Sequence, residues 1–283
     1  MEKQDIINLI KQKELQIQML NKEIIELNNE LKKVNNNHTI SIEEKVKIFA
    51  NYFKGRDDVY PYLSIDKSNP NKKYYIPKCK NEWNKLVCNK TMGKSCKNCQ
   101  YKELKPLTID VIKDHMYNNK TIGLYPMLKD ETCYLLAFDF DNKENQNDIK
   151  EDVLAFASVC DNFNIPIAIE KSRSGKGIHV WIFFENKIKA SIARKLGSLL
   201  LSKTMEIRDN LKIDSFDRMF PNQDYLPKGG YGNLIALPFQ TQPSKYGNTI
   251  FLDRNFLQIK NQIEYLNQIK KLSTEEVYNK IKE

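Results

Sequence analysis

The sequence predicts an α+β fold built on a β-α-β-β-α unit of the ferredoxin-like kind, with a mainly antiparallel sheet and helices on one face. Three observations predict it. Strand-like and helix-like hydrophobic patterns alternate in that order within residues 131–258. A cysteine-rich stretch precedes them, within residues 41–130. A heptad pattern of apolar residues fills the first 37 positions, which indicates a separate N-terminal helix.

The N-terminal segment repeats apolar side chains every seven positions. One series is Ile10, Ile17, Ile24 and Leu31, and the second is Ile6, Leu20, Leu27 and Val34, with Lys13 breaking it. Isoleucine at one core position and leucine at the other favour a parallel two-stranded coiled coil. We therefore expect residues 1–40 to form a coiled-coil helix that pairs two copies of the chain. The alternative is an amphipathic helix packed on its own chain.

Apolar periodicity places the elements of the central unit. We expect strands over 134–140, 166–170 and 178–184, helices over 148–163 and 189–207, and a turn over 171–177. A helix is expected over 41–53, and the charged residues 259–283 read as a C-terminal helix. The predicted parts are thus a helix over 1–40, a cysteine-bearing part over 41–130, a core over 131–258 and a helix over 259–283.

Charge and hydropathy limit the class of protein. The 283 residues carry 45 Lys and Arg against 36 Asp and Glu, a formal charge of +9, which favours polyanionic partners and nucleic acid first. No apolar run approaches the roughly 18–20 residues that cross a bilayer, and no secretion signal is evident, so we expect a cytoplasmic protein without membrane contact. Its cysteines should then be reduced thiols, so that a cluster of them suggests metal binding.

Four cysteines form such a cluster: Cys79, Cys88, Cys96 and Cys99. Four soft thiolates suit a structural, tetrahedral Zn²⁺. The spacing of the first pair is wide, so His115 is an alternative fourth ligand. Residues 78–105 also hold eight Lys and two Glu, a balance of +6 that suits contact with a phosphate backbone; the alternative is a merely solvated loop.

The acidic pair Asp139 and Asp141 ends an apolar strand. On a strand, residues i and i+2 point to the same side, so the two carboxylates lie side by side and repel each other. A divalent cation resolves that repulsion, and two hard oxygen ligands suit Mg²⁺ or Mn²⁺.

A glycine-rich turn directly precedes the next predicted strand. Its serines, Ser172 and Ser174, with Arg173, Lys176 and the backbone N–H groups, suit the cradling of phosphate oxygens. His179, one of only three histidines, is the second residue of that strand and lies beside the turn. We expect it to contact a triphosphate; the alternatives are a structural histidine and a plain hairpin.

Residues 212–240 supply the remaining candidates. Asp214 and Asp217 are both candidates for a third carboxylate, because two metal ions need at least three anionic ligands besides substrate phosphates. Amide and ammonium donors lie in the glycine- and proline-rich loop that follows, at Asn222, Gln223, Lys228 and Asn233.

These motifs resemble the catalytic domain of the archaeo-eukaryotic primase superfamily. Its three motifs are D-x-D or D-x-E, S-x-H, and a hydrophobic residue followed by Asp; here they read FDFD (138–141), SGKGIH (174–179) and ID (213–214). The chain is most similar to the primase domains of TOTE conflict systems and to CRISPR-associated primase-polymerases. Further shared segments are GRDDVY (55–60), CKNEW (79–83), GLYPML (123–128), SRSGKGIHVWIFF (172–184), DRMFPNQD (217–224) and GNLIALP (232–238).

The resemblance covers about residues 45–255 and implies a template-dependent nucleotidyltransferase, a DNA primase or primase-polymerase, that uses NTPs or dNTPs. It implies Asp139, Asp141 and Asp214 as ligands of two Mg²⁺ or Mn²⁺ ions, with Asp217 in reserve, and it favours Cys79 over His115 as zinc ligand. Ser172, Arg173, Ser174, Lys176 and His179 would hold the nucleotide with Asn222, Gln223 and Asn233.

The implied partners are a DNA or RNA template and primer, and helicase, defence or CRISPR-adaptation proteins. The rival readings are a non-catalytic zinc module that binds nucleic acid and a metal-dependent nuclease. The phosphate turn beside His179 favours a triphosphate substrate over water.

Overall fold

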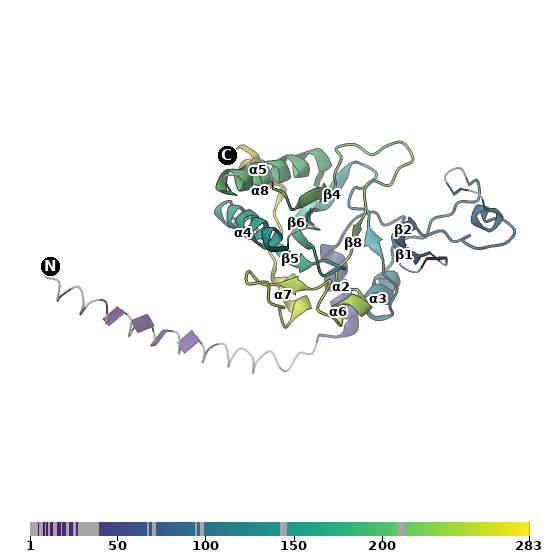
Figure 1. The fold of residues 1–283 in the computed structure, drawn as a ribbon. Coiled ribbons are helices and arrows are strands. Elements are labelled where there is room, and N and C mark those ends of the chain that lie inside the picture. The colour runs from purple at the N-terminus through teal and green to yellow at the C-terminus, as the bar shows by residue number, and fades with distance from the viewer. Residues whose placement is uncertain are drawn as a thin grey trace. The chain divides into compact units, whose positions relative to one another are not determined.

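The fold is described from a computed structural model (Figure 1). It describes residues 40–282 except 67, 70–71, 94, 97–98, 142–145 and 209–212, together with single positions between 5 and 27. The chain divides into two compact units, residues 1–44 and residues 45–283.

The described residues of the first unit between positions 5 and 27 are helical, as the heptad pattern predicts. Five of its heptad positions, Ile10, Ile17, Ile24, Leu20 and Leu27, are 50–58% exposed. The other heptad positions, Ile6, Leu31 and Val34, lie outside the described residues. Among the described residues of this unit, these five side chains therefore form an exposed apolar stripe.

The second unit has a mixed α/β architecture. Its helices are α2 (Ile42–Tyr52, begun in the first unit), α3 (Ile109–Tyr117), α4 (Gln146–Asn162), α5 (Ala190–Arg208), α6 (Thr241–Ser244), α7 (Gln262–Gln268) and α8 (Thr274–Lys282), with a 3-10 turn η1 (Asn89–Met92). Its strands are β1 (Pro61–Ile65), β2 (Lys73–Pro77), β3 (Gly123–Leu124), β4 (Thr132–Phe140), β5 (Ala168–Lys171), β6 (Ile178–Lys189), β7 (Phe216–Phe220), β8 (Ile235–Ala236) and β9 (Phe251–Leu252).

The central sheet has the strand order β7-β4-β6-β5-β9, and all of its neighbours are antiparallel. The elements β4-α4-β5-β6-α5 form the predicted β-α-β-β-α unit. Beside the sheet, β1 and β2 form a hairpin, and β3 pairs with β8. The cysteine-rich stretch begins where β2 ends.

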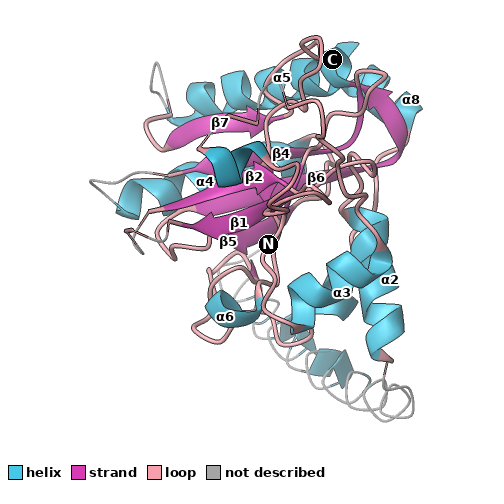
Figure 2. Ribbon diagram, turned by 90° about the vertical axis from the view of Figure 1, so that its right-hand side faces the viewer, coloured by secondary structure: helices cyan, strands magenta, loops and turns pink. Residues whose placement is uncertain are grey.

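Helices cover both faces of the sheet, whereas the sequence predicted helices on one face. Helices α4, α5 and α8 lie along one side, and α2 and α3 lie on the other (Figures 1 and 2). The reason is visible in β4: Leu136 and Phe138 face the first core, whereas Leu135 and Ala137 face the second, and all four are fully buried. A strand that is apolar on both faces needs cover on both.

Candidate active site

The register of the central sheet brings two of the predicted aspartates, Asp139 and Asp217, and His179 to one end of three strands. Asp139 of β4 lies directly opposite His179 of β6. On the other side of β4, Asp139 lies opposite Arg218 of β7, and a bulge there sets Asp217 next to this pair. The distance from His179 Nε2 to Asp139 Oδ1 is 3.6 Å. Segments far apart in the sequence thus meet at one site.

The carboxylates of this site repel one another. Burial raises the pKa of Asp139, the attraction of His179 opposes that rise, and the charges of Asp217 and Asp141 raise the pKa further. Asp141 is exposed just past the end of β4, where its N–H donates to the Ser215 carbonyl (2.7 Å). Hard oxygen donors in mutual repulsion suit a divalent cation.

His179 is held from behind by a buried carboxylate that the sequence reasoning missed. Glu170 of β5 lies opposite His179, and its Oε2 accepts hydrogen bonds from His179 Nδ1 (3.0 Å) and Trp181 Nε1 (2.8 Å). Burial alone would lower the pKa of His179, but Glu170 chiefly outweighs it and the pKa is raised. The available signal was a charged residue inside an otherwise apolar strand.

The glycine-rich turn closes on itself. Ser172 N–H donates to the Gly177 carbonyl (2.9 Å), and Gly177 N–H donates to Ser172 Oγ (3.0 Å). Gly175 N–H donates to the Ser172 carbonyl (3.0 Å), and Lys176 N–H donates to Ser174 Oγ (3.2 Å). The two serines therefore build the turn, and the expected cradle of amides for phosphate is not preformed. The Lys176 side chain is exposed.

Two glycines let this turn approach its neighbours. A Cβ on Gly177 would lie 2.9 Å from the Phe140 carbonyl oxygen and 3.5 Å from the Asp141 Cβ. Gly175 has a φ of 76°, and a Cβ there would lie 2.8 Å from Asn248 Oδ1. The turn consequently packs directly against the end of β4 that carries the acidic pair.

Arg173 points from the turn toward the short sheet. Its Nη1 donates to Gln240 Oε1 and lies 3.5 Å from Thr121 Oγ1. The Gln240 side chain is buried, and its Nε2 donates to the Leu237 carbonyl (2.9 Å). The Arg173 guanidinium is therefore held by Gln240, whose own side chain is held in place by its hydrogen bond to the Leu237 carbonyl.

The loop candidates are spread over a wider region. Asp214 is exposed in the turn before β7 and lines a hollow with Leu201 and Met205 of α5. Asn222 Oδ1 is buried and has no hydrogen-bond partner among the described residues. Gln223 Nε2 donates to the Tyr225 carbonyl (2.7 Å), and Asn233 is half-buried.

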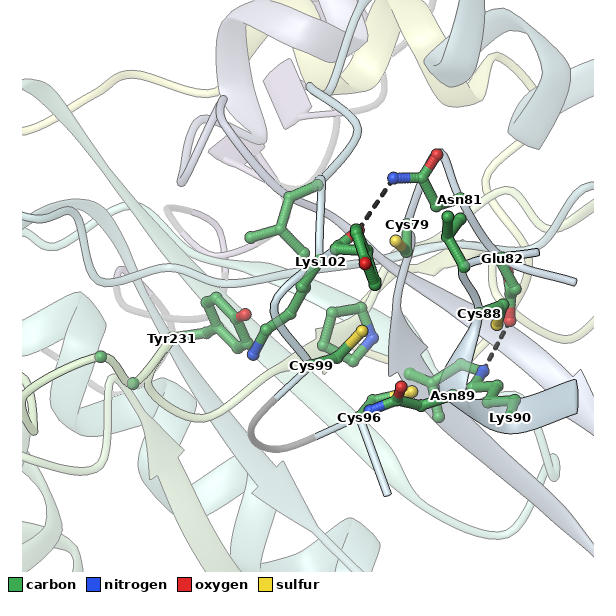
Figure 3. A pocket seen from close by; sticks show the side chains of 17 residues that line it. Cys79, Asn81, Glu82, Cys88, Asn89, Lys90, Cys96, Cys99, Lys102 and Tyr231 are labelled. Atoms are coloured by element: carbon green, nitrogen blue, oxygen red, sulfur yellow. Dashed lines mark hydrogen bonds and ion pairs between the residues drawn. The ribbon is translucent and has the colours of Figure 1, made fainter. Parts of the chain in front are cut away.

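The four clustered cysteines line one hollow of about 370 Å³, and all are free thiols (Figure 3). Burial raises the pKa of the Cys96 thiol, Lys90 opposes this, and the other three cysteines raise it further. Burial opposes ionisation of Cys88 too, but the N–H groups of Trp83, Lys90 and Thr91 lower its pKa. The thiols are therefore close enough to interact electrostatically.

Glu82 fixes part of this cysteine-bearing stretch. Its carboxylate pairs with Lys78 (2.8 Å) and Lys90 (2.6 Å) and accepts the hydroxyl of Tyr62 on β1 (2.5 Å). Lys80 forms another ion pair with Glu103 (2.5 Å). Several of the lysines expected to contact phosphate thus also hold the stretch together.

His115 is a structural residue, so it is a poor substitute for a cysteine ligand. It is fully buried in α3, its Nδ1 accepts the N–H of Ile122 (3.1 Å), and its Nε2 lies 2.7 Å from the Pro238 carbonyl. Both ring nitrogens are therefore in use, and burial lowers the pKa of His115 to about 4. Cys79, by contrast, lines the hollow with the other three thiols.

Within the part of the chain that is described, no three His, Cys, Asp or Glu side chains converge closely enough to hold a metal ion. The aspartates of the central sheet are hard ligands and the clustered cysteines are soft ones, so both groups have the chemistry to bind a metal ion. In the described residues, however, neither group is arranged as a complete set of metal ligands. Among the same residues, no helix is both long and apolar enough to cross a bilayer.

Comparison with known proteins places these features in a family. A family model described as the archaeo-eukaryotic primase domain of TOTE conflict systems matches residues 44–280. No curated protein matches the sequence. Among solved structures, the polymerase domain of Mycobacterium tuberculosis ligase D in complex with DNA is similar with a TM-score of 0.41 and 9% identity, over 86% of this chain and 88% of that one.

Proposed function

The chain belongs to the archaeo-eukaryotic primase family of TOTE conflict systems, and from this membership we propose that it is a template-dependent nucleotidyltransferase that makes or extends nucleic-acid strands. Its substrates would be NTPs or dNTPs and a DNA or RNA template, consistent with its formal charge of +9.

One observation carries the proposal: three adjacent strands bring carboxylates and a histidine to the same end of the sheet. Asp139, Asp141 and Asp217 would hold divalent cations there, and His179 faces the same point from β6. We place Asp217 ahead of Asp214, because the bulge in β7 sets Asp217 beside the pair of Asp139 and Arg218, where its charge raises the pKa of Asp139. Few protein ligands suffice, since Mg²⁺ keeps waters and takes substrate phosphates as well.

The chemistry that divalent cations supply at such a carboxylate cluster is activation of the attacking 3′-hydroxyl and stabilisation of the pyrophosphate that leaves. The residues of the chain position the substrate and offset its charge. His179 and Lys176 would contact the triphosphate, and Ser172 and Ser174 would keep the turn that carries Lys176 against the acidic strand. Arg173, Asn222, Gln223 and Asn233 would line the nucleotide pocket.

The test is strand synthesis by the purified full chain. A labelled primer on a template, and a template without primer, are incubated with NTPs or dNTPs and with Mg²⁺ or Mn²⁺. We expect product that requires template, nucleotide and metal. Absence of product under every combination would overturn the proposal.

The same assay addresses the rival functions. A metal-dependent nuclease would shorten the primer or template without added nucleotides. A non-catalytic binding module would shift labelled DNA in a gel but would neither extend nor cut it. The position of His179 favours a triphosphate partner over water, because its Nε2 faces the acidic end of β4 and can donate to a phosphate oxygen when it is protonated.

We also propose that Cys79, Cys88, Cys96 and Cys99 hold a structural Zn²⁺. Their shared hollow and their mutual electrostatic effect support this assignment. Bound zinc would order the lysine-rich stretch, which would then contact template or primer.

Replacing Cys96 and Cys99 with serine is expected to abolish zinc binding, because two hydroxyls replace two of the four thiolates. Elemental analysis of the wild type should give about one zinc per chain. The control is Cys160→Ala, a buried core cysteine of α4, which should keep the zinc. Equal zinc in the double serine variant, or none in the wild type, would contradict the assignment.

The exposed apolar stripe of the first unit supports a dimer through a parallel coiled coil. Removing residues 1–37 is expected to convert a dimer into a monomer, measured as a halving of mass by light scattering. Replacing two stripe residues with lysine, Ile17→Lys/Ile24→Lys, should do the same, whereas Gln12→Lys/Met19→Lys on the face away from the stripe should leave the dimer. A monomeric wild type would contradict the coiled coil.

A further inference from the structure

Glu170 is a buried acid that the roles proposed so far leave unexplained. It lies in β5, where its neighbours Ala168 and Ile169 are buried core residues, and it is itself 1% exposed. Removing a carboxylate from water costs several kcal/mol unless hydrogen bonds or charge compensate. Its two donors, His179 and Trp181, therefore account for its place in the fold.

The chemistry of these groups fixes where the imidazole carries hydrogen. A carboxylate accepts hydrogen bonds and does not donate them, so the His179 nitrogen at 3.0 Å, Nδ1, must be the donor. The indole N–H of Trp181, at 2.8 Å from the same oxygen, holds that oxygen in place. Trp181 is fully buried and stands edge-on to the imidazole, with ring centroids 6.0 Å apart.

The other ring nitrogen is thereby turned to the acidic end of β4. His179 Nε2 lies 3.6 Å from Asp139 Oδ1, which is longer than a normal hydrogen bond. The backbone supports the same arrangement, since the register sets Glu170 and Asp139 on opposite sides of His179. Strand pairing alone thus orders the three side chains as acid, imidazole, acid.

We infer that Glu170 is a positioning residue, which holds the Nδ1 side of His179 so that Nε2 faces the point where the nucleotide triphosphate binds and, when protonated, donates to a phosphate oxygen. This inference rests on the proposed function for its substrate, although the orientation itself does not. A partner of this kind fixes both the ring angle and the tautomer of a histidine, and its removal typically costs 10–100-fold in activity. A merely structural Glu170 would affect stability but not the orientation of the ring.

Two variants of similar size separate these roles. Glu170→Gln keeps a carbonyl oxygen that can accept from Nδ1, whereas Glu170→Leu removes the acceptor. The matched control is Glu185→Gln, an exposed glutamate on β6, the strand of His179.

The first readout is nitrogen-15 NMR of the histidine rings, which reports the protonated nitrogen without any catalysis. The chain has only three histidines, and the spectrum of a His179→Asn variant assigns the signals of His179. We expect hydrogen on Nδ1 in the wild type, in Glu170→Gln and in the control, and a mixture of tautomers in Glu170→Leu. Hydrogen confined to Nε2 in the wild type would overturn the inference even if neither Glu170 variant folds.

The second readout is steady-state synthesis. Glu170→Leu should lower kcat by about 10–100-fold with the KM for primer-template unchanged within about twofold, and Glu170→Gln should restore most of the rate. Adding Glu170→Leu to His179→Asn should cost little more, since the two residues act as one unit. Equal kcat in Glu170→Leu and wild type would overturn the inference. If the wild type makes no product, the proposed function fails, and the NMR result still decides the orientation.

Discussion

Replacing Asp139 and Asp141 together with alanine is expected to reduce strand synthesis by at least about 1,000-fold, because removing even one neutral hydrogen-bond donor that stabilises a transition state costs about 10²–10³. Both residues lie at the end of β4, beside His179 and Asp217, where the divalent cations would bind. The measurement is primer extension at saturating primer-template and nucleotide, with Mg²⁺ and with Mn²⁺. DNA binding, measured separately by fluorescence anisotropy, should stay within about threefold, since phosphate contacts come mainly from Lys and Arg.

The fold should survive this change. Burial and two neighbouring carboxylates raise the pKa of Asp139, so its ionised form destabilises the metal-free protein, and that cost grows as pH rises through the folded-state pKa. Thermal unfolding of metal-free Asp139→Asn at neutral pH should therefore occur at or above the wild-type temperature. The control is Asp130→Asn, an exposed residue just before β4 at its opposite end, which should synthesise normally. Synthesis by the double alanine variant at the wild-type rate would contradict the assigned site.

The longer elements of the central unit could be predicted because each has a clear hydrophobic period, whereas the single helix predicted over 259–283 is wrong: that segment forms two helices, α7 and α8. The predicted strand over 134–140 is observed as Thr132–Phe140, and the predicted helix over 189–207 is observed as Ala190–Arg208. The strand predicted over 178–184 continues to Lys189, because Ile188 is buried beyond the polar residues that seemed to end it. Cover on the second face of the sheet comes from α2 and α3, whose docking no local period encodes.

The residues of the site also fall into two groups: those that a local sequence motif predicts and those that only strand pairing places. Asp139 and His179 stand in local motifs, so a single pass along the sequence finds them. Glu170 contacts His179 only because the pairing register of β5 and β6 places the two residues opposite each other. That register cannot be predicted from the sequence of either strand alone. The sequence leaves the role of the turn open for a related reason: its amides and serine hydroxyls can serve a phosphate or one another, and in this fold the amides of Lys176 and Gly177 donate to the serines.

The sequence motif and the strand register favour different residues as the third carboxylate of the site. The resemblance implies Asp214 because it follows Ile213, but Ile213 is buried in the helix-facing core and Asp214 precedes β7. Asp217 lies within β7, at the bulge between the pairs Phe140–Phe216 and Asp139–Arg218. A bulge re-aims side chains at the rim of a sheet, and one extra residue cannot be located from spacing alone.

Asp217→Asn is accordingly expected to lower synthesis by about 10–150-fold, given that losing a charged contact costs roughly 1.5–3 kcal/mol, whereas Asp214→Asn should stay within about threefold. Both carboxylates are exposed, so neither change should unfold the protein. Arg218 offers a second test, because its guanidinium pairs with one of these carboxylates. Its Nε lies 2.7 Å from Asp217 Oδ2, and its positive charge also lowers the pKa of Asp139. Arg218→Gln should therefore alter the metal concentration that gives half-maximal synthesis, by removing a cation that competes for Asp217.

A metal titration separates a ligand from a neighbour. If Asp217 holds a divalent cation, the residual synthesis of Asp217→Asn should need a higher Mn²⁺ concentration for half-maximal rate, whereas Asp214→Asn should follow the wild-type curve. The reverse pattern, with Asp214→Asn inactive and Asp217→Asn normal, would show that the segment before β7 rearranges when nucleotide and metal bind. The Asp152 carboxylate accepts the Ser215 hydroxyl at 2.6 Å and so anchors that segment to α4. This anchor opposes such a rearrangement, which is why we expect Asp217 to be the third ligand.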